Sequence, residues 1–116
     1  MEKVPTDQYP NQQFEVILND QNCTIIIYQR TGHMYMTLYV DNTVIRQGQL
    51  MIPREPILTE PNDFDGNFYI VDTYTDAEYQ TIPDYELLND RYVLYYVTGD
   101  ERQEIKDYID EEAGVI

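Results

Sequence analysis

The clearest pattern along the chain is an alternation of apolar and polar positions in residues 34–41. The apolar positions are Met34, Met36, Leu38 and Val40, and the residue after each of them is Tyr, Thr or Asp. A period of two is typical of a β-strand with one face in the core. Asp41-Asn42 follows at once, and both residue types tolerate positive φ, so the pattern predicts a two-residue hairpin turn.

Five further segments have the length and composition of strands, and they cover residues 14–18, 23–30, 43–52, 67–73 and 91–97. The run that starts at Cys23 is apolar on both faces through Ile27, which predicts a central strand covered on both sides. Gly48 predicts a bulge or a bend. Between residues 67 and 73 the core pair is either Phe68 and Ile70 or the alternates Tyr69 and Val71.

These segments predict an all-β fold, because short turns join the first four strands into an antiparallel meander. Six short strands favour a small antiparallel six-stranded barrel or a closed sandwich, with a short C-terminal helix or tail. The chain then divides into an extended N-terminal arm (1–13), the β-barrel domain (14–97) and an acidic C-terminal helix or tail (98–116). The side chains expected to point inward are Met34, Met36, Leu38, Val40, Cys23, Ile25 and Ile27.

The C-terminal segment has the signals of a helix. Thr98 followed by Glu101 matches a capping box, and Ile105, Tyr108 and Ile109 fall at helical spacing. We expect a short amphipathic helix over roughly 100–112. Its apolar stripe is narrow and the helix would be marginal alone, so it must pack on the barrel, pack on a partner, or stay disordered.

The charge of the chain limits its partners. There are 22 acidic and seven basic residues, which gives a net charge of −15, and such a field repels nucleic acid. The acidity is consistent with simple solubility, with docking onto a basic protein surface, or with mimicry of DNA. Twelve tyrosines and no tryptophan suit half-buried strands and protein interfaces.

Residues for catalysis or metal binding are scarce. Cys23 is the single cysteine and His33 the single histidine, so neither a zinc site nor a catalytic triad is expected. Residues 63–66 superficially match a calcium loop, but the full spacing places Pro61 at the first ligand position. We therefore expect no enzyme, no cofactor and no metal. The segment after Met1 lacks the apolar stretch of a signal peptide, and no apolar run approaches the length of a membrane helix, so we expect synthesis in the cytoplasm.

The order of several short motifs resembles that of the baseplate plug family of contractile-tailed bacteriophages, which was first defined on a cyanophage. The matching motifs are Pro10-Asn11-Gln12 with Phe14, Cys23 at the start of a strand, Gly32 with Tyr35, Leu38, Val40 and Asp41, Gln47-Gly48-Gln49-Leu50, Phe64-Asp65-Gly66 with Val71-Asp72, and Arg91-Tyr92 with Leu94 and Tyr96. The resemblance covers about residues 10–97. The acidic stretch 59–90 and the tail after Thr98 depart from it.

The resemblance implies a structural protein of the virion that plugs the distal end of the tail tube. Its partners would be baseplate hub, spike and tail-tube proteins and further copies of itself, with neither nucleic acid nor membrane. An acidic inhibitor that mimics DNA and blocks a host DNA-binding protein is the alternative, and it would carry carboxylates in two rows on one face. The residues expected to contact partners are Tyr74, Tyr79, Tyr85, Ile105, Tyr108 and Ile109.

Overall fold

The computed structural model describes residues 1–53, 55–58, 64–73 and 83–112, without the side chains of residues 102 and 109–112. Its strands are β1 (Glu2–Val4), β2 (Asn11–Leu18), β3 (Gln21–Arg30), β4 (His33–Val40), β5 (Thr43–Leu50), β6 (Asn67–Asp72) and β7 (Tyr92–Val97). A 3₁₀ turn, η1 (Tyr85–Leu87), precedes β7. A second, η2 (Gly99–Glu101), precedes the helix α1 (Arg102–Glu112). The all-β prediction is confirmed, and so is the short C-terminal helix.

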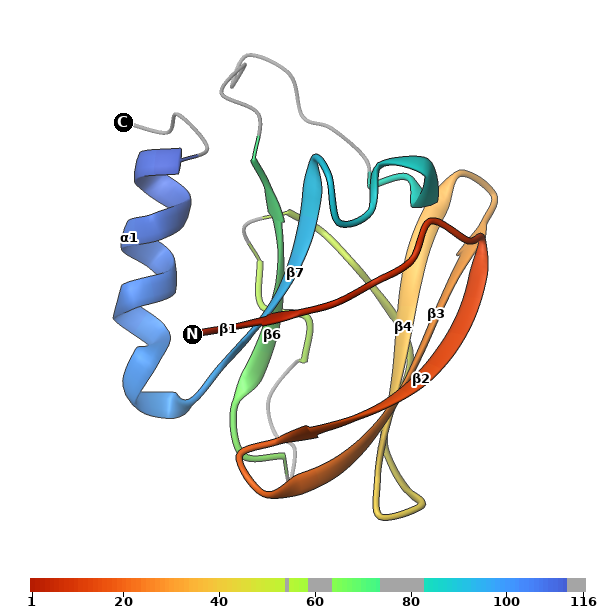
Figure 1. Ribbon diagram of the computed structural model, residues 1–116, viewed down its shortest axis with the longest axis horizontal. Coiled ribbons are helices and arrows are strands. Elements are labelled where there is room, and N and C mark those ends of the chain that lie inside the picture. Colours follow the sequence, from red (N-terminus) through yellow and green to blue (C-terminus); the bar gives the residue numbers. More distant parts are fainter. Residues whose placement is uncertain (54, 59–63, 74–82, 113–116) are drawn as a thin grey trace.

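The strands form two antiparallel sheets (Figure 1). The large sheet has the order β2-β3-β4-β5, and the small sheet has the order β1-β7-β6. The small sheet lies between the large sheet and α1, so the described part of the chain has three layers (Figure 1). The chain passes from β1 in the small sheet to β2 in the large sheet through residues 5–10.

The large sheet has the predicted meander order, and the residues predicted to face inward do so. Asp41 and Asn42 have φ of 50° and 67°, so the predicted two-residue turn is confirmed. Between β4 and β5 the register shifts near Gly48, whose φ is +65°, and its N–H donates to Thr37 Oγ1 at 2.9 Å. This confirms an irregularity at Gly48. Alternate side chains of β3 and β4 point to the core, and Tyr35 and Tyr39 lie on the opposite face.

Two details of the prediction were wrong. The strands do not close into a six-stranded barrel, because β6 pairs with β7 and the two sheets share no ladder among the described residues. The additional strand β1 came from the predicted N-terminal arm, where it pairs with residues 94–96 of β7. The second error concerns β3, which is central in its sheet but covered on one face only, since Thr24, Ile26 and Tyr28 are half-buried.

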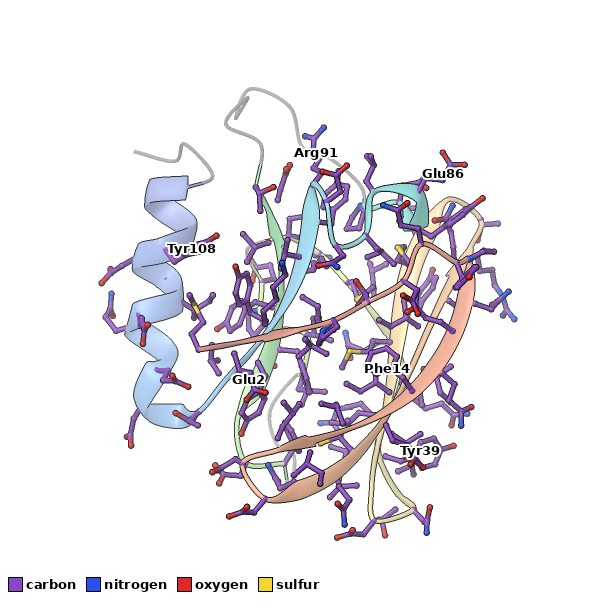
Figure 2. All side chains as sticks on the ribbon, in the orientation of Figure 1. Glu2, Phe14, Tyr39, Glu86, Arg91 and Tyr108 are labelled. Atoms are coloured by element: carbon purple, nitrogen blue, oxygen red, sulfur yellow. The ribbon has the colours of Figure 1, made fainter. Side chains whose placement is uncertain are left out.

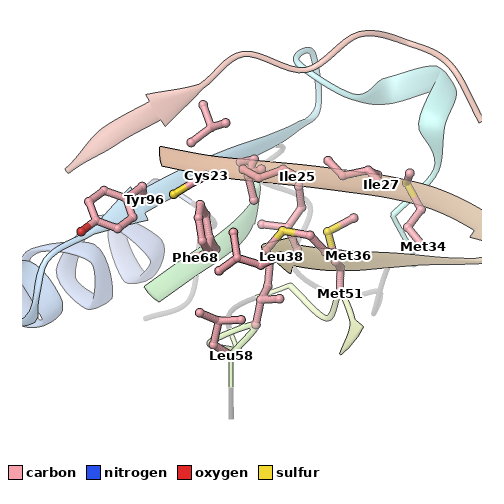
Figure 3. Packing of buried hydrophobic residues seen from close by; sticks show 14 of the residues in the cluster. Cys23, Ile25, Ile27, Met34, Met36, Leu38, Met51, Leu58, Phe68 and Tyr96 are labelled. Carbon is pink, nitrogen blue, oxygen red and sulfur yellow. The ribbon is translucent and has the colours of Figure 1, made fainter. Parts of the chain in front are cut away.

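The main core fills the space between the two sheets (Figure 3). Its fully buried large side chains include Leu18, Ile25, Ile27, Met34, Met36, Leu38, Met51, Ile57, Leu58, Phe68, Ile70 and Tyr92. Phe68 stacks on Phe64 with ring centroids 5.4 Å apart, and Tyr96 packs against both rings. All of the residues predicted to point inward line this core, with Val40 only partly buried.

The small sheet has a second, smaller core on its other face. Tyr69, Val71 and Val97 pack there with Ile105 of α1. Every residue of β6 is consequently buried, so both of the predicted alternatives for its core pair are occupied at once. A strand with apolar side chains on both faces needs a layer on each side, and α1 provides the second one.

Cys23 contributes to the main core as an apolar side chain and is 1% exposed. Burial raises the pKa of its thiol from 9.0 to about 11. At pH 8 this shift lowers the thiolate fraction about a hundredfold, and the thiolate is the reactive form. We expect iodoacetamide to alkylate the native chain at least about a hundredfold more slowly than the chain in guanidinium, as measured by intact mass. Equal rates would contradict a buried Cys23.

Candidate functional site

The helix α1 carries three of the predicted partner-contact residues. Ile105 is 0% exposed and packs in the second core against the small sheet. Tyr108, labelled on α1 in Figure 2, is half-buried. Its ring meets that of Tyr95 edge to face at 5.5 Å, with the two hydroxyl oxygens 3.3 Å apart. The side chain of Ile109 lies outside the described residues. Within the chain, Ile105 and Tyr108 therefore attach α1 to the sheet.

The start of α1 is held by Thr98 and Glu101, as the capping box predicts. The backbone N–H of Thr98 donates to Glu101 Oε1 at 3.0 Å, and the Thr98 hydroxyl donates to the same atom at 3.1 Å. The other oxygen, Oε2, forms an ion pair with the N-terminal ammonium of Met1. Glu101 thus ties the beginning of the helix to the beginning of β1.

Tyr85 is the one predicted loop tyrosine that the structure describes. It opens η1, where its N–H donates to Gln29 Oε1 of β3 at 3.0 Å, and its half-buried ring packs against the edge of the main core. Asp84 caps this turn by accepting from the N–H of Glu86 at 3.0 Å. The negative charge of Glu86 raises the pKa of the Tyr85 hydroxyl. Tyr74 and Tyr79 lie outside the described residues.

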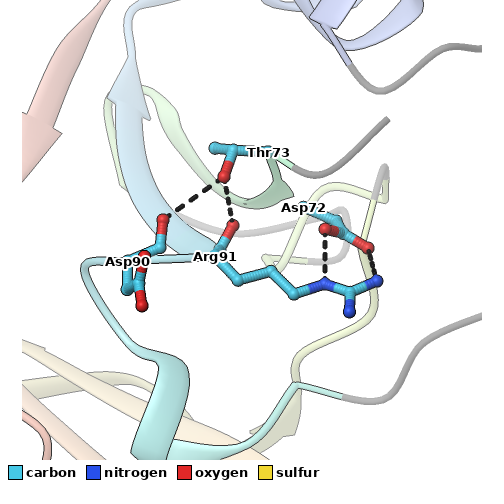
Figure 4. A network of polar contacts seen from close by, with 4 residues as sticks. All are labelled: Asp72, Thr73, Asp90 and Arg91. Atoms are coloured by element: carbon cyan, nitrogen blue, oxygen red, sulfur yellow. Dashed lines mark hydrogen bonds and ion pairs between the residues drawn. The ribbon is translucent and has the colours of Figure 1, made fainter. Parts of the chain in front are cut away.

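A polar network fixes the end of β6 to the start of β7 (Figure 4). Arg91 donates from Nε and Nη2 to the two carboxylate oxygens of Asp72 at 2.8 and 2.9 Å, a bidentate geometry. The Thr73 hydroxyl donates to the carbonyl oxygen of Arg91 at 2.8 Å, and the N–H of Thr73 donates to the same oxygen at 2.8 Å. Residues 73 and 91 are thereby held together at the two ends of the intervening acidic segment.

Asp65, in the segment that resembles a calcium loop, is engaged in structural hydrogen bonds. Its carboxylate accepts from Asn19 Nδ2 at 2.8 Å, and its carbonyl oxygen accepts from Gln21 Nε2 and from the Tyr96 hydroxyl. These bonds join the β2–β3 turn to the end of β7, so they connect the two sheets. In the described part of the chain no three His, Cys, Asp or Glu side chains are grouped as metal ligands would be.

The structure also shows a tyrosine patch that the sequence reasoning did not propose as an interface. It consists of Tyr28, Tyr35 and Tyr39, which alternate with the buried residues of β3 and β4 and so lie on the outer face of the large sheet; Figure 2 labels Tyr39. The rings of Tyr28 and Tyr35 stack with centroids 5.5 Å apart, and all three side chains are partly exposed. The alternation in residues 34–41 could have revealed this patch, because it places Tyr35 and Tyr39 opposite the core.

The acidic residues are concentrated outside the sheets. Of the 22 acidic residues of the chain, only Glu2, Glu15 and Asp72 lie in the strands that the structure describes. Asp72 is paired with Arg91, so the sheets contribute little free negative charge. The other acidic residues lie outside these strands, and in α1 Glu104 and Asp107 are exposed.

Comparison with known families shows a match to the family described as cyanophage baseplate Pam3 plug gp18, over residues 1–100. This region includes all seven strands and ends just before α1. The chain belongs to this baseplate plug family. Comparison with curated proteins finds no match.

Membership of the baseplate plug family gives the chain a structural role in the tail baseplate of a phage virion. A baseplate plug associates with other baseplate or tail proteins, and its role is non-enzymatic. None of the helices in the described residues has the length and apolar character needed to cross a membrane. The features of interest for function are therefore the surfaces that contact neighbouring proteins.

Proposed function

We propose that this chain closes the distal end of the tail tube by packing against hub, spike and tail-tube proteins, with several copies in one baseplate. It would be made in the host cytoplasm and then assembled into the particle. The observation that carries this proposal is the family match over residues 1–100, which includes every strand of both sheets. The mechanism is steric: the packed chains fill the opening until contraction drives the tube forward.

The distribution of side chains supports a packing role. Tyrosine gives large contact areas at low entropic cost, and the acidic segments attract basic neighbours in a salt-dependent manner. In this proposal the contacts come from the arm, from residues 59–67 and 74–90, and from the tail after Thr98, including Tyr74, Tyr79 and Tyr85. Ile105 and Tyr108 hold α1 against the small sheet, and Ile109 remains a predicted contact.

A DNA mimic is the competing function, and the charge placement argues against it. A mimic needs carboxylates at phosphate-like spacing on one rigid face, whereas the described strands hold three acidic residues, of which Asp72 is neutralised by Arg91. The outer face of the large sheet presents the tyrosine patch instead. That arrangement fits a surface that packs against proteins better than one that occupies a DNA-binding groove.

The direct test is mass spectrometry of purified phage particles combined with immunogold labelling of the intact tail. We expect the chain in stoichiometric amounts in the particles, with gold at the distal end of uncontracted tails. Detection only in infected-cell extracts, or copurification with a host DNA-binding protein, would contradict the proposal and favour the mimic.

The predicted loop contacts can be tested by replacing Tyr74, Tyr79 and Tyr85 with serine in the phage. We expect incorporation into particles to fall more than the melting temperature of the isolated chain does, because tyrosines at an interface contribute strongly to binding, whereas the half-buried Tyr85 packs only at the edge of the main core. The matched control replaces Ile52, which is 47% exposed and lies outside the proposed contact segments, with serine. Normal assembly of the triple variant would show that these tyrosines are not contacts.

A further inference from the structure

The strand β2 forms one edge of the large sheet, and its outward backbone groups are open. Asn19-Asp20 makes a two-residue hairpin turn with both φ positive, so Leu18 and Gln21 form a hydrogen-bonded pair. The other end of the ladder shows the same alternation, because there the even-numbered Pro10 is also bonded to β3: the N–H of Gln29 donates to its carbonyl oxygen at 2.9 Å. The even-numbered residues of β2 therefore bond to β3, and the odd-numbered residues direct their N–H and C=O groups away from the sheet.

These outward groups belong to Asn11, Gln13, Glu15 and Ile17, whose side chains are all exposed. Within the described residues, no backbone hydrogen bond from another segment reaches them. Four consecutive outward positions give a regular row of donors and acceptors about 20 Å long, at about 3.4 Å per residue. Such a row is a template for one more strand.

The other three edges differ from β2 in the described part of the chain. The edge of β5 is interrupted at Gly48, where the register shifts. The edge strand β1 has only three residues. The edge of β6 is partly covered, since the N–H of Ile57 donates to the carbonyl of Phe68 at 2.8 Å. Irregular, short and covered edges are the usual means of blocking strand addition, and β2 shows none of them.

Exposed apolar side chains lie at both ends of this edge. Ile17 is 66% exposed and Tyr9 is 61% exposed, the two highest values among the large apolar side chains that the structure describes. Beside Ile17, a hollow of about 490 Å³ lies between the β2–β3 hairpin and the β4–β5 turn. Its lining includes the acidic residues Glu15 and Asp41 and contains no lysine or arginine. One carboxylate oxygen of Asp41 accepts from Asn22 Nδ2 at 3.0 Å.

We propose that the edge of β2 binds an extended segment of a neighbouring baseplate protein as a fifth strand of the large sheet, with a lysine or arginine of that segment in the hollow. The basic character follows from Glu15 and Asp41, and from the net charge of −15. A second copy of this chain would bring the same charge to the edge and be repelled. The inference rests on the proposed packing role, because it names where and how a neighbour attaches.

Proline provides a selective test at Gln13. Gln13→Pro removes an outward N–H and leaves the β2–β3 ladder intact, because the ladder uses the even-numbered residues. Gln13→Ala keeps the N–H and is the matched control. We expect the isolated proline variant to melt within a few degrees of the control, and its copy number in purified particles to be about tenfold lower, which corresponds to loss of one interprotein hydrogen bond.

A second pair of variants tests the hollow and does not depend on how proline is tolerated. Glu15→Gln and Asp41→Asn remove the two charges while keeping size and, at position 41, a residue type that accepts positive φ. We expect the double variant to be lost from particles at lower salt than the wild type. Retention of both the double variant and Gln13→Pro at wild-type levels would overturn the proposal.

Crosslinking identifies the occupant and separates this inference from the proposed function. A photoreactive phenylalanine derivative at position 13 should form an adduct, in intact particles, with a segment of another virion protein that contains lysine or arginine. An adduct with a second copy of this chain would overturn the assigned occupant. Absence of the wild-type chain from particles would refute the plug role itself. Incorporation of the wild type together with full retention of Gln13→Pro and of the double variant would refute only the role of the edge.

Discussion

Gly66→Ala is expected to destabilise the chain by about 2–6 kcal/mol, the sum of about 1–3 kcal/mol for backbone strain and a similar cost of overpacking. Gly66 has φ of +116°, which L-residues rarely adopt. A Cβ there would lie 2.5 Å from the carbonyl oxygen of Val97 and 2.6 Å from the ring of Tyr96. The backbone oxygen cannot move without disturbing β7, so the strain cannot be relieved locally.

Two other glycines separate the causes of this effect. Gly32 has φ of +79° but nothing within 4 Å of the position that a Cβ would take, so Gly32→Ala should cost about 1 kcal/mol from φ alone. Gly99 has neither feature, and Gly99→Ala should be nearly neutral. Thermal or urea unfolding should therefore show the largest loss of unfolding free energy for Gly66→Ala, a smaller loss for Gly32→Ala and the smallest for Gly99→Ala. Equal losses at 66 and 32 would show that the close approach to Val97 is absent.

Ile105→Asp is expected to release α1 from the small sheet and to lower the free energy of unfolding by about 2–4 kcal/mol, from lost apolar burial and the cost of a charge in the second core. Ile105 is 0% exposed, whereas its neighbours Glu104 and Lys106 are exposed. An isolated helix of 11 residues is marginal in water, so the released α1 should unfold.

Hydrogen exchange measures this release residue by residue. We expect amides of α1 to lose protection in Ile105→Asp while those of β3 and β4 keep it, because the main core lies on the other face of the small sheet. Gln103→Asp introduces the same charge on the exposed face of α1, where it removes only the hydrogen bond that Gln103 donates to Asp107, and it should lower protection far less than Ile105→Asp does. Global unfolding of Ile105→Asp would instead show that α1 is essential to the family fold.

The sequence predicted local structure more successfully than it predicted the arrangement of the sheets. Asp41-Asn42 and the alternation after His33 defined a hairpin and its inward face, because neighbouring residues determine both. The strand β1 could not be found in this way, since Glu2–Val4 has no distinctive pattern and is ordered by pairing with residues 94–96. The barrel prediction failed for the same reason: which strands become neighbours across 50 or more residues is decided by packing.

The candidate contact residues show a similar division. That tyrosines and acidic residues mark the interaction segments remains a prediction for all of the candidate contact residues, and Tyr74 and Tyr79 lie outside the described part of the chain. Ile105 was identified correctly as part of an apolar stripe, but the pattern could not tell whether the stripe faces a partner or its own sheet. Open backbone groups on β2 leave no trace in the sequence, because side-chain identity does not record which edge of a strand is paired.

The short ladder between β1 and β7 determines how the chain would respond to pulling. Glu2 pairs with Tyr96 and Val4 with Leu94, so the start of β1 and the end of β7 lie side by side. Tension applied between the N-terminus and residue 98 would therefore separate this ladder one pair at a time, starting at Glu2, and never load all of its hydrogen bonds together. Strands whose hydrogen bonds break one pair after another separate at low force. A neighbouring protein bound to both ends could therefore detach β1 while the large sheet stays folded.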